Sequence, residues 1–229
     1  MPDFPRTSRW TRHLVYRAEH TRTTWTLRLS VLALLVVVPW LTSSCWTGAI
    51  GRSLVCAESI APSDAILVEN FDPDYLLFEH ARELRRAGLA PRVLVPVPMD
   101  QGSKQPKDVA RGITELLATL SRIGEIEIVP IGEQEPITLN AARDVQRYLK
   151  REHIRSVIVV TPLFRSRRSA LVNAATLERE GIVTHCAPVR NPQTGDDWTA
   201  SWHGVQNVAE QWVKLQYYRF YVLPFRSDR

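Results

Sequence analysis

The sequence predicts a doubly wound α/β domain with a mostly parallel five-stranded sheet, preceded by one N-terminal transmembrane helix. Short apolar segments alternate with longer segments of helical periodicity between residues 62 and 223. The short segments are nearly continuous apolar runs, which is typical of parallel strands covered by helices on both faces. An uncharged, largely apolar stretch precedes this alternating region and has the length of a membrane span.

Each element of the Rossmann-like domain, residues 62–223, has its own signal. The apolar segments that predict strands are residues 64–70, 91–98, 125–132, 155–161 and 182–189. The segments with apolar residues at helical spacing are residues 74–88, 107–124, 138–153, 165–181 and 201–220. In the last of these, Trp202, Val205, Ala209 and Trp212 fall on one stripe, which we expect to pack into the core.

The N-terminal arm, residues 1–28, carries most of the excess positive charge. It holds six arginines against Asp3 and Glu19, a net charge of +4 out of +5 for the whole chain. A nucleic-acid-binding domain would carry its basic excess on one face of the folded part. The charge distribution therefore predicts no nucleic-acid partner.

Residues 29–49 form the predicted transmembrane anchor. Arginines before it and few charges after it place the N-terminus in the cytoplasm and the following domain outside, by the positive-inside rule. The densely apolar part, residues 31–41, is short enough that a cleaved signal peptide is the alternative. Residues 50–61 are predicted to be a linker. We expect a single-pass protein of a bacterial inner membrane with a periplasmic or otherwise extracytoplasmic domain.

The chain has three cysteines. Cys45 falls in the predicted span, so that only Cys56 and Cys186 could pair in the domain. Such a small number does not suggest a disulfide framework, and we expect two unpaired thiols. A disulfide between Cys56 and Cys186 is the alternative.

Polar residues follow the predicted strands, and ligands of open parallel sheets bind at the carboxyl ends of strands. Three arginines, Arg165, Arg167 and Arg168, lie where the fourth strand gives way to a helix. Helix-start amides and guanidinium groups both favour phosphate or carboxylate oxygens, so we expect an anion site there, with Arg167 left in solvent. The candidate ligand-binding residues are Asn70, Asn140, Thr161, Arg165 and Arg168.

The sequence offers few signals of catalysis. Glu69 and Asp100 follow the first two strands and are the candidate general bases. There is no glycine-rich phosphate loop, no serine-hydrolase elbow and no metal-ligand spacing of histidines or cysteines. We therefore predict no cofactor and no metal, and leave open whether the protein is an enzyme.

The segments "DAILV", "ELRRAGLAPRVLV", "LNAARDV" and "VIVVTPLFRSRRSAL" together resemble the YdcF/SanA/ElyC-like family, known by its domain of unknown function 218. The similarity covers roughly residues 62–190. Val160, Thr161, Phe164, Arg168 and Asn140 match the family pattern, whereas Arg165 stands where the family usually has a histidine. The resemblance implies a role in envelope integrity, peptidoglycan and lipid-carrier homeostasis, or barrier function.

Two functional hypotheses follow. The first is a membrane-anchored protein that binds an anionic envelope metabolite, phosphorylated or lipid-linked, at the candidate residues. The second is a non-catalytic module whose aromatic segment "WVKLQYYRFYVLPF" docks on an envelope protein partner or on the membrane surface. A nucleotide or methyl-donor binder rests on fold analogy alone.

Overall fold

The computed structural model describes residues 24–100, 105–191 and 197–226. Most of the predicted basic arm, residues 1–23, lies outside them. The chain divides into two compact units, Met1–Cys45 and Trp46–Arg229, which are described separately. In the first unit, helix α1 (Trp25–Leu41) has no buried residue.

The predicted span is not one continuous helix. Helix α1 ends at Leu41, and α2 (Ser43–Ser53) begins two residues later. At the end of α1 the hydroxyl of Thr42 donates to the carbonyl of Val38 at 2.8 Å, in addition to the regular backbone bond of 3.0 Å. Pro39 supplies no N–H to the preceding turn, which weakens the helix there. Within the described residues no single helix has the length and apolarity to cross a membrane; Trp25–Leu41 and Cys45–Ser53 meet these criteria only as a broken pair.

The second unit contains the predicted five-stranded sheet. All neighbouring strands are parallel, and their order is β3-β2-β1-β4-β5. The strands are β1 (Ala65–Val68), β2 (Arg92–Pro98), β3 (Glu127–Ile131), β4 (Ser156–Pro162) and β5 (Val183–Val189). From β1 the chain builds the sheet outward in one direction to β3, then returns to the other side of β1 for β4 and β5. The α/β, Rossmann-like prediction is confirmed.

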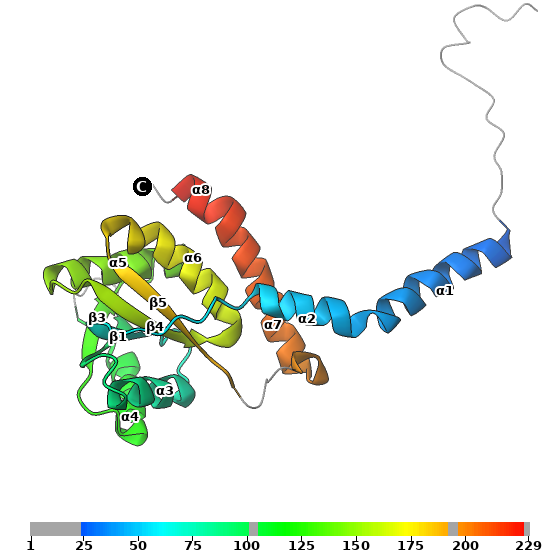
Figure 1. Ribbon diagram of the computed structural model, residues 1–229. Helices are drawn as coiled ribbons and strands as arrows, with labels where there is room; N and C mark the ends of the chain where they lie inside the picture. Colours follow the sequence, from blue (N-terminus) through cyan, green and yellow to red (C-terminus); the bar gives the residue numbers. More distant parts are fainter. Residues whose placement is uncertain (1–23, 101–104, 192–196, 227–229) are drawn as a thin grey trace, which may run out of the picture. The chain divides into compact units, whose positions relative to one another are not determined.

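Helices cover both faces of this sheet, as the continuous apolar strands predict. Helices α3 (Tyr75–Arg86) and α4 (Asp108–Ser121) lie on one side, and α5 (Ile137–Arg151) and α6 (Ser166–Thr176) on the other (Figure 1). Alternate residues of each strand face the two layers: Ile66 and Val68 pack in the core with α3, whereas Ala65 and Leu67 pack in the core with α5.

Short turns flank α6. A 3₁₀ turn, η2 (Leu163–Arg165), joins β4 to α6, and a second, η3 (Glu178–Glu180), follows it. Gly181 then takes φ +78°, a left-handed conformation that glycine adopts without steric cost, and leads into β5. The predicted single helix over 165–181 is therefore shorter at both ends.

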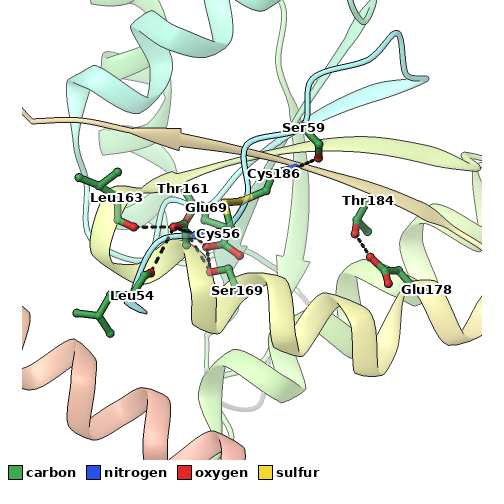
Figure 2. Close-up of a disulfide and its surroundings, with 11 residues drawn as sticks. Leu54, Cys56, Ser59, Glu69, Thr161, Leu163, Ser169, Glu178, Thr184 and Cys186 are labelled. Atoms are coloured by element: carbon green, nitrogen blue, oxygen red, sulfur yellow. Dashed lines mark hydrogen bonds between the residues drawn. A yellow bond between two sulfur atoms is a disulfide. The ribbon is translucent and has the colours of Figure 1, made fainter. Parts of the chain in front are cut away.

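The segment predicted as a linker, residues 50–61, is instead packed against the domain. Leu54 is 1% exposed and belongs to a cluster with Phe164, Trp198 and Val208. Cys56 forms a disulfide with Cys186 of β5 (Figure 2). The expectation of two unpaired thiols was wrong, because the packing of Leu54 brings the segment across β5 and within bonding distance of Cys186.

The C-terminal elements are a turn, η4 (Trp198–Ala200), helix α7 (Trp202–Tyr217), a π-helical turn, η5 (Tyr218–Val222), and α8 (Leu223–Arg226). The predicted apolar stripe of α7 was wrong for three of its four residues: Trp202 is 74% exposed, Trp212 is 44% exposed and Ala209 is exposed, whereas Val205 is partly buried against a core cluster. The buried stripe lies one position away, at Gly204, Val208, Gln211 and Leu215. Gly204 sets this rotation, since a Cβ there would lie 2.2 Å from the carbonyl oxygen of Trp198.

Candidate functional site

The candidate site lies where the sheet changes its winding direction. β1 and β4 are neighbours, but the chain leaves them toward opposite sides of the sheet, so their following loops separate at the carboxyl edge. Such a crevice is where open parallel sheets bind ligands. The loop after β1 supplies Phe71 and Asp72, and the turn after β4 supplies Arg165.

A buried hydrogen-bond cluster underlies this crevice (Figure 2). Glu69 is 5% exposed, and its Oε2 accepts hydrogen bonds from Thr161 Oγ1 at 2.7 Å and from Ser169 Oγ at 2.5 Å. The two donors come from β4 and α6. Glu69, which follows β1, is thus a carboxylate that links β1, β4 and α6. Its hydrogen bonds satisfy the polar side chains of Glu69 and Thr161, which are both buried.

Arg165 is the first cation of the site. Its side chain is 8% exposed and forms an ion pair with Asp72, whose side chain is 80% exposed. The guanidinium also lies 5.7 Å from the ring centroid of Phe71. Its Nε and Nη1 atoms are buried and have no hydrogen-bond partner among the described residues. One exposed carboxylate therefore satisfies only part of this guanidinium.

Arg168 is the second cation, one turn into α6. It is 5% exposed, and its guanidinium lies 5.6 Å from the ring centroid of Tyr218. Its Nε has no hydrogen-bond partner within the described part of the chain. Burial first, and repulsion from Arg165 second, lower the pKa of Arg168, while Glu69 acts in the opposite direction. A bound anion would offset the repulsion between the two guanidinium groups.

The two arginines line one cavity of about 420 Å³. Besides them, the wall contains a third cation, Lys214, from α7. The wall also contains two carboxylates from the loop after β3, Glu133 and Glu135, and three aromatic rings, those of Phe71, Tyr217 and Tyr218. The cavity therefore combines buried positive charge with aromatic surface at the carboxyl ends of β1, β3 and β4.

The start of α6 differs from the expected open helix N-terminus. The N–H of Arg167 donates to the carbonyl of Leu54 at 2.9 Å, and the N–H of Cys56 donates to Ser166 Oγ at 3.0 Å. The segment before β1 thus caps this helix. Arg167 itself is exposed, as predicted. Positive charge at the site comes from the two buried guanidinium groups.

Three other predicted residues lie apart from the arginines. Asn70 donates to Thr114 Oγ1 of α4 at 3.1 Å, and Asn140 donates to the carbonyl of Gln134 at 3.0 Å. Asp100 is exposed, and its backbone N–H donates to the carbonyl of Gln105. None of the three lines the arginine cavity among the described residues. Of the predicted ligand-binding residues, Arg165 and Arg168 line this cavity. Thr161 is 0% exposed and is bonded to Glu69, and neither of these two residues lines the cavity among the described residues.

The sequence prediction missed the contribution of the C-terminal helix to the site. Lys214, Tyr217 and Tyr218 come from α7 and η5, about 45 residues after the arginines. The sequence feature that could have indicated this contribution is the aromatic pair Tyr217-Tyr218, on a segment with apolar residues at helical spacing. It did not lead to a prediction of site residues because the expected buried face of α7 was one position away from the observed one.

Within the described ranges no cluster of three or more histidine, cysteine or acidic side chains could hold a metal ion. In comparisons with protein-family models, curated proteins and solved structures, nothing matches this chain. The resemblance to the YdcF/SanA/ElyC-like family stays a prediction.

Proposed function

We propose that this chain is a membrane-anchored, outward-facing protein of the cell envelope that binds an anionic metabolite, phosphorylated or lipid-linked, at the carboxyl ends of its strands. The observation that carries the proposal is the buried pair Arg165 and Arg168. Both line one cavity, and three of their guanidinium nitrogens lack partners among the described residues. Buried donors of this kind almost always have a partner in native proteins, either protein or ordered water, and guanidinium groups are well suited to bind an anion.

The unpaired guanidinium donors, rather than the net charge of the wall, favour an anion with more than one acceptor oxygen. The wall holds three cations, Arg165, Arg168 and Lys214, and three carboxylates, Asp72, Glu133 and Glu135. Arg168 has no ion pair with a described carboxylate, and Arg165 has only exposed Asp72. Lys214 is already paired with Glu210. A phosphate group can accept from both guanidinium groups at once, which matches the number of free donors.

The envelope setting is supported by two further observations. The broken helix pair Trp25–Leu41 and Cys45–Ser53 meets the length and composition of a membrane span when the two helices are taken together. The Cys56–Cys186 disulfide is typical of an oxidising compartment, such as a periplasm. The proposal is one of binding rather than catalysis, because Glu69 is held by two hydroxyls and neither Glu69 nor Asp100 lines the cavity among the described residues.

A thermal-shift experiment on the full chain in mild detergent tests the binding proposal. The probes are inorganic phosphate, glycerol 3-phosphate and a short-chain polyprenyl phosphate. A ligand at about 100 times its Kd stabilises by about 2.7 kcal/mol, which raises the Tm of a chain of this size by roughly 5 to 10 °C. We expect this rise in Tm for wild type. For Arg168→Ala we expect only a small fraction of it.

Arg167→Ala is the matched control, because Arg167 is the exposed neighbour of Arg168 on the same helix. It should show the wild-type rise. Arg168→Lys keeps the charge but loses the planar fork, so an intermediate rise is expected. If no probe raises the Tm of wild type, or if Arg168→Ala responds like wild type, the anion site is refuted.

A second candidate function is docking of the C-terminal segment on a membrane surface. Between Trp212 and Phe225 the exposed side chains include large apolar groups together with the cations Lys214 and Arg219. The exposed apolar residues are Trp212, Val213, Tyr217, Phe220, Tyr221 and Phe225. This segment contains no acidic residue. Aromatic and basic residues together are typical of surfaces that bind anionic lipid headgroups.

Hydrogen exchange in lipid nanodiscs tests this second candidate with the full chain. If the segment docks, deuterium uptake of residues 212–226 is slower in nanodiscs with anionic lipid than in purely zwitterionic ones. Peptides from α4, which also exposes Val109 and Leu116, serve as the internal control. Equal uptake of residues 212–226 in both lipids would count against docking.

A further inference from the structure

A second cavity adjoins the arginine cavity and shares two of its residues. It has a volume of about 280 Å³, and Arg165 and Asp72 line both cavities. Its other walls follow β4 and β5 and include the apolar residues Pro162 and Phe164. The Arg165–Asp72 ion pair is therefore the boundary between two spaces at the same edge of the sheet.

The second cavity contains an unsatisfied amide. Gln211 of α7 lines it and is 7% exposed, and its Oε1 atom has no hydrogen-bond partner among the described residues. A buried carbonyl oxygen without a donor is unfavourable and uncommon in native proteins. A second amide side chain, Asn207, lies one turn earlier on α7 in the same cavity. The cavity thus offers two amides, together with the charged groups of Asp72, Asp74 and Arg165, beside apolar walls.

We infer that the ligand has two parts: a phosphate that binds Arg165 and Arg168, and a hydroxyl-bearing group that donates to Gln211 in the second cavity. A sugar phosphate has this chemistry, since its hydroxyls match the amides and its C–H faces match proline and aromatic walls. Arg165 lines both cavities, and its Nε and Nη1 are buried without a partner among the described residues. The inference rests on the proposed anion site and adds Gln211 as the residue that sets specificity.

The expected selectivity follows from the buried amide. A site built to hydrogen-bond a hydroxyl discriminates strongly against an analogue that lacks it, because the protein group is then left unpaired. Inorganic phosphate should engage only the arginines. A phosphate ester without hydroxyls should fill the second cavity and leave Gln211 unsatisfied, and so bind more weakly than a sugar phosphate.

Isothermal titration of the full chain in mild detergent tests this inference with three probes: inorganic phosphate, cyclohexyl phosphate and α-D-glucose 1-phosphate. Wild type should bind glucose 1-phosphate about tenfold or more tightly than cyclohexyl phosphate. Gln211→Met, similar in length but without the carbonyl, should reduce this ratio to about one and leave the affinity for inorganic phosphate within about twofold. Gln216→Met on the same helix is the matched control and should keep the ratio.

The outcomes separate the inference from the function on which it rests. If wild type binds none of the probes, or if Arg168→Ala binds all of them as wild type does, the anion site fails and the inference fails with it. If Arg168→Ala loses binding but wild type does not distinguish the two esters, the anion site stands and the two-part ligand is refuted. The comparison of the two esters uses wild type alone, so it tests the two-part ligand even if Gln211→Met folds poorly.

Discussion

Thr161 at the end of β4 donates a hydrogen bond to Glu69 just after β1, with 2.7 Å between Oγ1 and Oε2. These residues lie 92 positions apart in the chain, and they face each other because β1 and β4 are adjacent and parallel. Ser169 adds a second donor to the same oxygen from α6. The carboxylate therefore holds the two strand ends and the arginine-bearing helix together beneath the cavity.

Glu69→Ala should destabilise the domain. It leaves the hydroxyls of Thr161 and Ser169 buried without their acceptor and removes the nearby negative charge from Arg168. The expected loss is about 1–3 kcal/mol in the free energy of unfolding, measured by urea denaturation. Glu69→Gln keeps one carbonyl oxygen as acceptor and should lose less. The exposed Glu125→Ala is the control, and an equal loss in that variant would contradict the role given to Glu69.

Thiol counting checks the disulfide. In the folded, unreduced chain only Cys45 should react with a thiol reagent, and all three cysteines should react after reduction and unfolding. Replacement of Cys56 and Cys186 by serine should lower the free energy of unfolding by about 2–4 kcal/mol, because the bond closes a long loop of the unfolded chain. Three reactive thiols in the unreduced protein would rule the bond out.

Asp72→Asn should increase the affinity of the cavity for phosphate. Asp72 competes with a bound anion for Arg165, and the asparagine side chain keeps a carbonyl oxygen that can accept a hydrogen bond from this buried guanidinium. Since an exposed ion pair contributes about 0.2–1 kcal/mol, the gain should reach up to about fivefold in Kd for inorganic phosphate. Asp108→Asn, exposed on α4, is the control. Unchanged or weaker binding in Asp72→Asn would show that Asp72 does not compete.

Acid should weaken the junction between β1 and β4. The backbone N–H of Arg155, with further hydrogen bonds from Ser156, lowers the pKa of Asp64 below its ordinary value. Because folding favours the ionised form, the stabilisation is present above about pH 4 and is lost as the pH falls through the lowered pKa. Asp64→Asn should therefore lose less stability than wild type between about pH 5 and pH 2, measured by urea unfolding at each pH. The exposed Glu58→Gln should follow wild type.

Much of the sheet could be predicted from the sequence because its strands are continuous apolar runs separated by clear helical periodicity. Val157–Val160 and Val93–Val97 are continuous apolar runs, as expected for strands of a parallel sheet whose two faces are both buried. The rotation of α7 could not be predicted from apolar pattern alone. Its buried stripe contains Gly204 and Gln211, which are not apolar markers, and close contact between backbone atoms decides which side faces inward.

The candidate site was predicted in part for a similar reason. Arg165, Arg168 and Thr161 are local to one strand end, so a single stretch of sequence places them together. Asn140 was misplaced because its amide satisfies the carbonyl of Gln134, a local contact that competes with any ligand. The disulfide was missed because it depends on Leu54 packing, and nothing in the composition of residues 50–61 distinguishes a packed segment from a linker.

The disulfide also determines how mechanical tension would enter the domain. Any pull on the chain before Trp46 passes along α2 to Cys56 and from there through a covalent bond to Cys186 in β5. The stretch from Ala57 to Asp64, which leads to the central strand β1, lies beyond this bond and carries little of the load. Such a pull would therefore reach the edge strand β5 before it reached the central strand β1.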